Sequence, residues 1–267
     1  MAERIGPDGA VIEALDEAIV TRDLFPALAS GGYQAVAVYL LSAYASPVHD
    51  MRLEAMIVAA LPGIRVAASH EVAPEFREFE PASTTDLSAY VQPMIDGYLE
   101  RFEATLAGAG FIGHFSVMQS NGGRMPATAM RSNAISALLS GPAAGVVGAI
   151  RVGAIRQAAR SRRGNLVTFD MGGTSTDVSL VQDGEAALAA ETQLDGLPIR
   201  TPVLDIVTVG AGGGSLIWVD DGNMQRVGPR SAGAQPGSAC FGHGDTLPSV
   251  TDAHVEHHPF KGNRLNR

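Results

Sequence analysis

Short apolar runs and segments of helical apolar spacing alternate in the first part of the chain. Apolar runs at residues 35–41 and 64–68 flank a helical segment at 47–60, which Pro47 can begin. A strand, a helix and a second strand in this order predict a parallel pair joined by a crossover. The pattern therefore indicates an α/β protein in which helices flank mixed sheets.

The next segment predicts a loop and then a long helix. Residues 71–80 are charged and contain Pro74, which favours a loop. Ser-Thr-Thr-Asp at residues 83–86 is expected to cap a helix that runs to about residue 106. Pro93 lies inside this helical pattern and predicts a kink.

Two glycine-rich segments follow the long helix. The predicted strand 115–118 ends in the amide-rich turn 119–123, which fits either a ligand contact or a plain surface turn. Ser-Gly-Pro-Ala-Ala-Gly-Val-Val-Gly at residues 140–148 opens a helix whose small residues recur every three to four positions. This small face is expected to pack closely on a strand. The basic cluster at 156–163 fits a solvated helix end.

The most distinctive stretch is Asp-Met-Gly-Gly-Thr-Ser-Thr-Asp at residues 170–177. Apolar runs at 166–169 and 178–181 flank it, which predicts a strand, a tight turn and a returning strand. Glycines let backbone N–H groups approach an anion, and Asp170 and Asp177 could hold a divalent cation. The stretch therefore predicts a site for phosphate with Mg²⁺. The alternative is a plain β-hairpin with a polar turn.

A second glycine cluster stands at another predicted strand end. The apolar run 203–209 stops at Gly-Ala-Gly-Gly-Gly-Ser, residues 210–215. Ser215 occupies the place of the last glycine in a dinucleotide fingerprint, so that site is not predicted. Several backbone donors at a strand end still favour contact with phosphate or adenosine. A strand at 216–219 and a loop at 228–244 are expected next.

Composition narrows the class of protein. The 267 residues are 46% hydrophobic, enough for a substantial core in one or two domains. A net charge of -9 argues against a nucleic-acid partner. The single cysteine, Cys240, rules out an intrachain disulfide and predicts a reducing compartment such as the cytoplasm. We expect its thiol to be buried and inert. The apolar run 35–45 is too short for a bilayer span, so no membrane insertion is expected.

The histidine-rich end, residues 254–267, has its own composition. Three clustered histidines are compatible with a metal site, but an unstructured tail is favoured. The sequence contains no Walker-type nucleotide loop.

Four ordered motifs, at residues 117–123, 139–149, 168–178 and 208–215, resemble the hydantoinase A/5-oxoprolinase family of ATP-dependent lactamase subunits. The resemblance implies an actin-like ATPase fold, in which two ribonuclease-H-like halves close on a nucleotide. By the resemblance, residues 1–160 would be the C-terminal part of the first half with connecting helices. Residues 161–253 would begin the second half, which carries the phosphate loop.

The resemblance also implies an activity. Family members use ATP and Mg²⁺ to phosphorylate a cyclic amide of the hydantoin or 5-oxoproline type, usually with a B-type partner subunit that completes ring opening. Asp170 and Asp177 would be the catalytic and metal-binding carboxylates. The nucleotide would contact two groups of residues, namely Gly172, Gly173, Thr174 and Thr176 in the hairpin, and Gly210, Gly212, Gly213, Gly214 and Ser215 in the second cluster.

Departures from the family pattern keep a second function open. Family members normally begin with another Asp-x-Gly-Gly-Thr loop, which this sequence lacks, and they continue well past the motif at residues 251–253. The fold is therefore expected to be incomplete at both ends. Val207 and Pro81 stand where the family pattern has histidine and arginine. The alternative is a catalytically incomplete module that binds nucleotide or acts in assembly. Exposed apolar strand edges would favour an oligomer or a partner.

Overall fold

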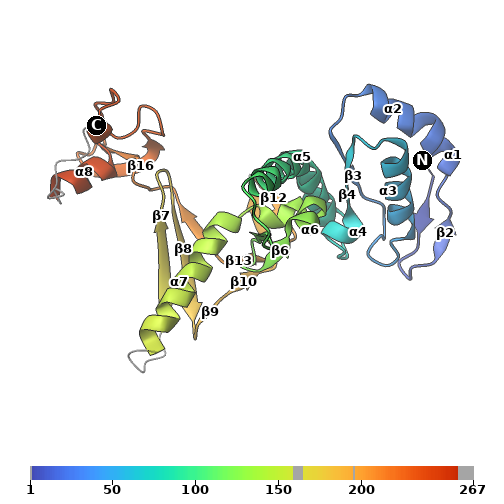
Figure 1. Ribbon diagram of the computed structural model, residues 1–267, viewed down its shortest axis with the longest axis horizontal. Helices are drawn as coiled ribbons and strands as arrows, with labels where there is room; N and C mark the ends of the chain where they lie inside the picture. Colours follow the sequence, from blue (N-terminus) through green and yellow to red (C-terminus); the bar gives the residue numbers. More distant parts are fainter. Residues whose placement is uncertain (1, 159–164, 195, 258–267) are drawn as a thin grey trace. The chain divides into compact units, whose positions relative to one another are not determined.

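The computed structural model describes residues 2–158, 165–194 and 196–257 (Figure 1). Contacts group the chain into two compact units. Unit 1 comprises Met1–Ala144 with Leu188–Leu204, and unit 2 comprises Gly145–Ala187 with Asp205–Arg267. The division falls inside helix α7 (Ser140–Ala158). The assignment of these parts to two halves of an ATPase stays a prediction.

The predicted crossover is confirmed in unit 1. Strands β3 (Ala35–Val38) and β4 (Arg65–Ala68) are parallel and in register, and α3 (Val48–Ala60) connects them. Pro47 is the N-cap of α3, as its fixed φ favours. Apolar side chains from these elements and from the preceding helical segment form one core cluster, namely Val20, Val38, Leu53, Ile57 and Ala68.

Short elements precede this crossover. They are β1 (Arg4–Ile5), β2 (Val11–Glu13), α1 (Glu17–Ile19), a π-helical turn (Val20–Leu24) and α2 (Phe25–Ser30). Strands β1 and β2 pair antiparallel. The buried ring of His49 on α3 lies 2.8 Å from a carboxylate oxygen of Glu3, which ties this end of the chain to the crossover.

The long helix begins earlier than predicted. Helix α5 spans Phe79–Gly108 with Pro93 inside it, and α4 (Ser69–Val72) also lies in or next to the predicted loop. The prediction of a helix cap at residues 83–86 is wrong because two of these side chains bond within the helix. The buried hydroxyls of Thr84 and Thr85 donate to backbone carbonyls four residues earlier, each at 2.7 Å. Pro81 is buried in the first turn, where a missing N–H costs no helical bond.

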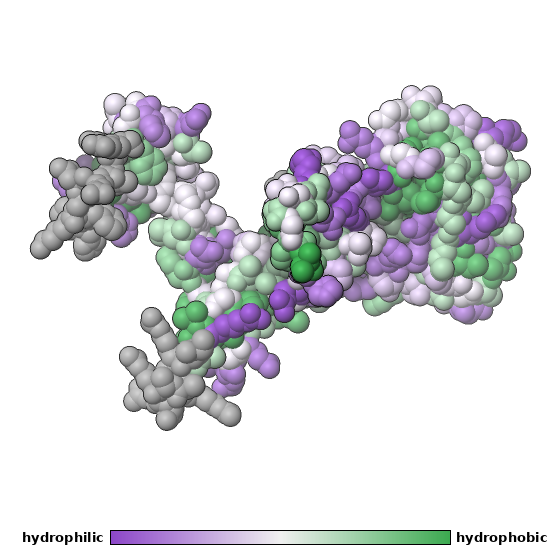
Figure 2. All heavy atoms as spheres, in the orientation of Figure 1, coloured by the Kyte–Doolittle hydropathy of each residue, from purple (hydrophilic) through white to green (hydrophobic). Residues whose placement is uncertain are grey.

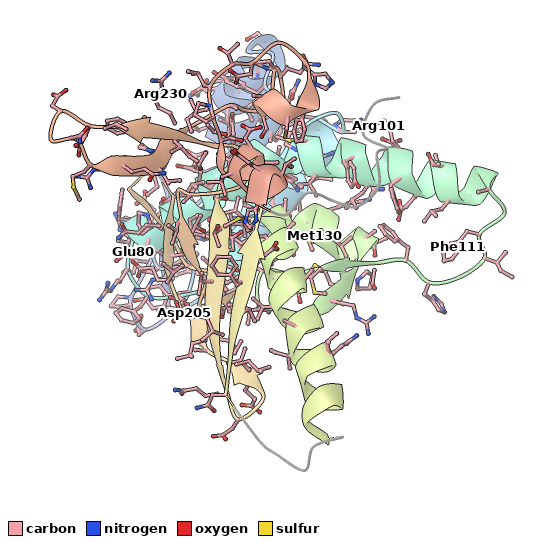
Figure 3. The ribbon with its side chains drawn as sticks, turned by 90° about the vertical axis from the view of Figure 1, so that its left-hand side faces the viewer. Glu80, Arg101, Phe111, Met130, Asp205 and Arg230 are labelled. Atoms are coloured by element: carbon pink, nitrogen blue, oxygen red, sulfur yellow. The ribbon has the colours of Figure 1, made fainter. Side chains whose placement is uncertain are left out.

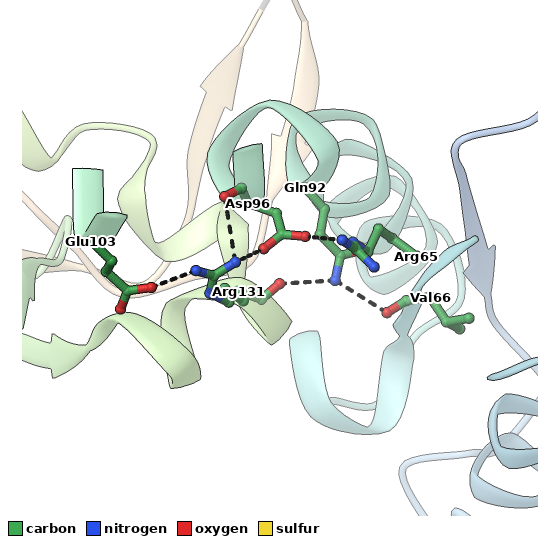
Figure 4. A network of polar contacts seen from close by, with 6 residues as sticks. All are labelled: Arg65, Val66, Gln92, Asp96, Glu103 and Arg131. Atoms are coloured by element: carbon green, nitrogen blue, oxygen red, sulfur yellow. Dashed lines mark hydrogen bonds and ion pairs between the residues drawn. The ribbon is translucent and has the colours of Figure 1, made fainter. Parts of the chain in front are cut away.

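A polar network joins α5 to its neighbours in unit 1 (Figure 4). Asp96 on α5 accepts from Arg65 on β4 and from Arg131 on α6 (Ala127–Ser132). The side-chain nitrogen of Gln92 donates to the carbonyl of Arg131 at 2.9 Å. Buried charges need partners of opposite sign, so the network fixes the positions of three elements at once.

A hairpin and the segment Leu188–Leu204, which follows part of unit 2 in the sequence, complete unit 1. Strands β5 (Ser116–Met118) and β6 (Arg124–Pro126) flank the predicted turn 119–123, and the structure adds a 3-10 turn at Ala134–Ala137. The segment Leu188–Leu204 holds β10 (Leu188–Ala189), β11 (Thr192–Leu194), β12 (Leu197–Ile199) and β13 (Val203–Leu204). Its Ile199 is fully buried in a cluster with Ala67 and Ile135, which explains why this segment belongs to unit 1.

Some apolar surface of unit 1 is uncovered in this chain. Tyr90, Met94 and Tyr98 lie four residues apart along α5 and are 79%, 66% and 55% exposed. Phe111, in the loop after α5, points away from it (Figure 3). Figure 2 shows apolar side chains interspersed with polar ones on the face that it draws. Self-association through such surface stays a prediction.

Unit 2 is built on an antiparallel sheet. Its strands are β7 (Leu166–Met171), β8 (Thr176–Gln182), β9 (Glu185–Ala186) and β14 (Val207–Val209), with β8 between β7 and β14. A second antiparallel pair, β15 (Ser215–Val219) and β16 (Gln225–Ser231), is followed by a 3-10 turn (Ala239–Phe241) and α8 (Val250–His257). The predicted loop 228–244 is therefore wrong at its start, because the pairing with β15 draws residues 228–231 into a strand.

The structure also bears on the expectations for the single cysteine, the C-terminal tail and membrane insertion. Cys240 is exposed in the 3-10 turn, so the expectation of a buried thiol is wrong. Residues 254–257 are helical, whereas the rest of the predicted tail, 258–267, lies outside the described residues, as do residues 159–163 of the basic cluster. Among the described helices, none is both long and apolar enough to cross a membrane.

Candidate functional site

The predicted strand, turn and returning strand are confirmed at residues 166–182. Strands β7 and β8 pair up to Met171 and Thr176, which leaves a four-residue turn between them. The N–H of Gly172 donates to the carbonyl of Ser175 at 2.8 Å and closes this turn. Gly173 and Thr174 form its exposed tip.

The two aspartates of the motif stand directly opposite each other. Asp170 pairs with Asp177 across the hairpin, so both carboxylates emerge on the same face of the sheet. Thr208 on β14 is the next partner of Asp177, and its hydroxyl donates to an Asp177 carboxylate oxygen at 2.6 Å. Like charges in opposed positions are unfavourable, and a bound cation would offset that repulsion.

The second glycine cluster docks on the hairpin turn. The N–H groups of Gly213 and Gly214 donate to the carbonyls of Gly172 and Gly173 at 2.9 and 2.6 Å. The buried hydroxyl of Thr176 donates to the carbonyl of Ala211. The hairpin turn and the second glycine cluster, which are distant in the sequence, are therefore joined by direct hydrogen bonds.

The close approach explains why glycine is required at position 212. A Cβ added to Gly212 would lie 2.7 Å from both the carbonyl oxygen of Gly172 and the amide nitrogen of Ser175. Both are backbone atoms, so neither can move aside as a side chain would. By contrast, a Cβ on Gly210 would meet nothing within 4 Å.

The residues predicted to contact nucleotide fall into two groups, according to whether their backbone N–H groups bond within the protein. Gly212, Gly213, Gly214 and Ser215 form internal hydrogen bonds, and the hydroxyl of Ser215 accepts the N–H of Gly212 at 2.8 Å. Within the described part of the chain, no protein acceptor receives the N–H of Gly173 or Thr174. The tip of the turn therefore offers two free backbone donors next to the carboxylate pair.

Helix α7 covers one side of the hairpin through its small residues. A Cβ on Gly145 would lie 3.1 Å from a carboxylate oxygen of Asp170, and one on Gly153 would lie 2.4 Å from the side chain of Leu166. The expectation that the small face of this helix packs on a strand is confirmed at Gly145, whereas a Cβ on Gly141 or Gly148 would meet nothing within 4 Å. Asp205, which Figure 3 labels, lies just before β14. It also contacts the sheet, because its carbonyl accepts the hydroxyl of Ser179 at 2.8 Å.

The start of α8 supports the glycine cluster, a role that sequence reasoning missed. Both the N–H and the hydroxyl of Thr251 donate to the carbonyl of Gly213 at 2.8 Å. The N–H of Ser249 donates to Asp252 at 2.7 Å, and the N–H of Asp252 donates back to the Ser249 hydroxyl at 3.3 Å. The spacing Ser-x-x-Asp is the available sequence signal, since it is a variant of the helix capping box.

The Asp252 carboxylate is an acceptor for several donors. It also accepts the N–H of Cys240 at 2.7 Å. Burial raises the pKa of this carboxyl, but the N–H of Cys240 and the hydroxyl of Ser249 outweigh burial and lower the pKa to about 2. The ionised form is therefore the one that the folded protein stabilises.

Replacing Asp252 by alanine is expected to lower the free energy of unfolding of unit 2 by about 1–3 kcal/mol, because the donors around it lose their acceptor. The folded pKa is depressed, so the stabilisation is fully present above about pH 4 and is lost as the pH falls towards about 2. Thermal unfolding of both proteins at neutral and acidic pH tests this. Asp221→Ala, at an exposed site, is the control, and a stability loss as large in this control as in Asp252→Ala would contradict the role.

Comparison with known proteins is consistent with this geometry. The model of the family described as Hydantoinase/oxoprolinase matches residues 82–256. The alpha subunit of caprolactamase from Pseudomonas jessenii is 39% identical over 254 residues, which cover 94% of this chain and 35% of that protein. The 5-oxoprolinase of Saccharomyces cerevisiae is 36% identical over 247 residues, covering 92% of this chain and 18% of that protein.

Solved structures agree with the sequence relatives. The crystal structure of the ATP-dependent caprolactamase from Pseudomonas jessenii superposes with a TM-score of 0.75 at 38% identity, over 95% of this chain and 36% of that one. Nucleotide-free acetone carboxylase gives a TM-score of 0.74 at 26% identity, over 95% and 35% of the two chains. The chain thus spans about a third or less of the length of these proteins.

Proposed function

Because the chain belongs to the hydantoinase/oxoprolinase family, we propose that it is a component of an ATP-dependent enzyme that phosphorylates and opens a cyclic amide. The observation that carries this proposal is the opposed pair Asp170 and Asp177, beside the free N–H groups of Gly173 and Thr174. Carboxylates suit a divalent cation, and free backbone donors suit phosphate oxygens.

The chemistry explains why such a site is needed. An amide is a poor electrophile, and a phosphoryl group converts its oxygen into a leaving group. Phosphoryl transfer depends mainly on positioning and on neutralising negative charge. Asp170 and Asp177 would hold Mg²⁺, which when bound would neutralise charge on the phosphates. The turn would orient the phosphates through its free amides.

The names of the relatives support a substrate class and a partner. Caprolactamase and 5-oxoprolinase favour a lactam-type substrate, of which hydantoin and 5-oxoproline are examples. Relatives named as a subunit alpha and a subunit gamma favour a partner subunit, which we propose to be of the hydantoinase B type. We further propose that unit 2 contains the phosphate-loop part of an actin-like ATPase. A cytoplasmic location stays a prediction from the single cysteine.

A second function remains the alternative proposal. The 267 residues contain one Asp-x-Gly-Gly-Thr loop, at residues 170–174. A single loop of this kind would suffice for a module that binds nucleotide without turning it over and acts only in a larger complex.

Steady-state ATP turnover separates the two functions. The folded chain is assayed with Mg²⁺ and with 5-oxoproline, hydantoin or caprolactam, both alone and with a candidate B-type subunit. The enzyme proposal predicts that one of these amides stimulates phosphate release in at least one combination. Absence of turnover in every combination, from a chain whose folding is verified by circular dichroism, would overturn the enzyme proposal and favour the binding module.

A further inference from the structure

A cluster of metal-ligating side chains lies in unit 1, away in sequence from the glycine motifs. Glu54 on α3 and His70 and Glu71 on α4 place one ligand atom each within 4.8 Å of one another. The Nε2 atom of His70 is 3.7 Å from a carboxylate oxygen of Glu54. The crossover from α3 through β4 into α4 brings these residues together.

The three side chains of the cluster differ in their exposure to solvent. The side chain of His70 is 11% exposed and that of Glu54 is 25% exposed, whereas Glu71 is open to solvent. The imidazole is therefore mostly enclosed by the protein, whereas the two carboxylates are more accessible to solvent. Such a site leaves a path for an ion to enter and room for water as a further ligand.

The other nitrogen of the His70 ring supplies an independent observation. Among the described residues, its Nδ1 atom is buried and has no hydrogen-bond partner. The nearest carboxylate oxygen, on Asp50, is 3.8 Å away, so a shift of about 1 Å would form a hydrogen bond. Metal-bound histidines usually donate their second ring N–H to such a carboxylate, which orients the ring.

Asp50 is itself fixed for that role. It is 1% exposed, and it accepts the hydroxyl of Ser69 at 2.6 Å and the N–H of Leu40 at 3.1 Å. Burial raises the pKa of the Glu54 carboxyl, and the proximity of Glu71 raises it further. Three carboxylates thus surround one imidazole, and a bound cation would offset the repulsion among them.

We propose that Glu54, His70 and Glu71 bind a divalent transition-metal cation, and that Asp50 positions the imidazole. One nitrogen and two oxygen ligands favour Zn²⁺ or Mn²⁺, because Mg²⁺ prefers oxygen ligands alone. Its ligands lie in unit 1, whereas Asp170 and Asp177 of the proposed Mg²⁺ site lie in unit 2.

Calorimetric titration of the full chain with Zn²⁺, in the presence of excess Mg²⁺, tests the proposal. The wild-type chain is expected to bind Zn²⁺ at a site that Glu71→Gln and His70→Gln each weaken by about tenfold or more, since even outer contacts to a metal site are worth that much. Zn²⁺ should also raise the unfolding temperature of the wild type more than that of Glu71→Gln at the same concentration.

The matched control is His114→Gln, which removes an exposed histidine of unit 1 that lies outside the cluster. It should leave the affinity unchanged. Glu54→Gln serves as a further ligand variant if His70→Gln does not fold. No Zn²⁺ binding by the wild type, or the same affinity in wild type and Glu71→Gln, would overturn the proposal. The second result would assign the binding to other groups, such as the histidines of residues 254–258.

Discussion

Replacing Gly212 by alanine is expected to lower the free energy of unfolding of unit 2 by about 3 kcal/mol. The new Cβ would lie 2.7 Å from backbone atoms of Gly172 and Ser175. Those atoms cannot retreat, because the N–H groups of Gly213 and Gly214 bond the same turn at 2.9 and 2.6 Å. Displacing the glycine cluster should also move Gly173 and Thr174, so nucleotide binding should fall together with stability. Urea unfolding and calorimetry with MgATP measure the two effects.

The chain offers a matched control two residues earlier. A Cβ on Gly210 would meet nothing within 4 Å, and this glycine has no positive φ. Gly210→Ala is therefore expected to change stability by no more than about 0.5 kcal/mol. Equal stability losses in Gly210→Ala and Gly212→Ala would show that the docking of the glycine cluster on the turn is not what requires glycine at position 212.

Replacing Asp177 by alanine is expected to remove the Mg²⁺ dependence of nucleotide binding and to weaken affinity for MgATP by about 10- to 100-fold, as for the loss of a charged contact. The fold should persist, because Asp177 is only partly buried. The loss of its 2.6 Å bond from Thr208 is partly offset by relief of repulsion from Asp170.

Calorimetry with ATP, with and without Mg²⁺, measures this effect. Glu185→Ala is a suitable control because Glu185 is an exposed carboxylate on β9 of the same sheet. It should bind MgATP as the wild type does. Unchanged affinity in Asp177→Ala would count against a metal-binding role for this carboxylate.

The parts of the fold that sequence reasoning predicted are those that local pattern determines. The crossover from β3 through α3 to β4 follows from two apolar runs around a segment that Pro47 begins. The hairpin of β7 and β8 follows from apolar runs around a glycine pair. In each case the residues that specify the element lie within it or beside it, so their spacing is sufficient.

The parts that were missed depend on contacts between distant segments. Nothing local in residues 188–204 indicates that Ile199 is buried in unit 1, because its partners come from other parts of the chain. The start of α5 was missed because Thr84 and Thr85 resemble caps, although their hydroxyls bond inside the helix. The cluster of Glu54, His70 and Glu71 is not evident from the sequence, because His70 and Glu71 lie at the edge of a charged segment that predicts a loop. Only the packing of α4 on α3 brings Glu54 close to them.

The candidate site shows the same division. The sequence identified the residues of both glycine clusters, but it could not sort them by role. Hydrogen bonding within the protein now separates Gly213 and Gly214, whose amides hold the cluster on the turn, from Gly173 and Thr174, whose amides are free. That distinction depends on the folded structure, since every non-proline residue offers the same N–H group in the sequence.

Amide hydrogen exchange at the hairpin turn, with and without saturating MgATP, tests the proposed phosphate site most directly. The free N–H groups of Gly173 and Thr174 should exchange fast in the unliganded chain and become protected when MgATP binds. The amides of Gly213 and Gly214 should be protected in both states. At the same MgATP concentration, Asp177→Ala should show much less protection at the turn than the wild type. Unchanged exchange at residues 172–175 in the folded wild-type chain with saturating MgATP would contradict a phosphate site at this turn.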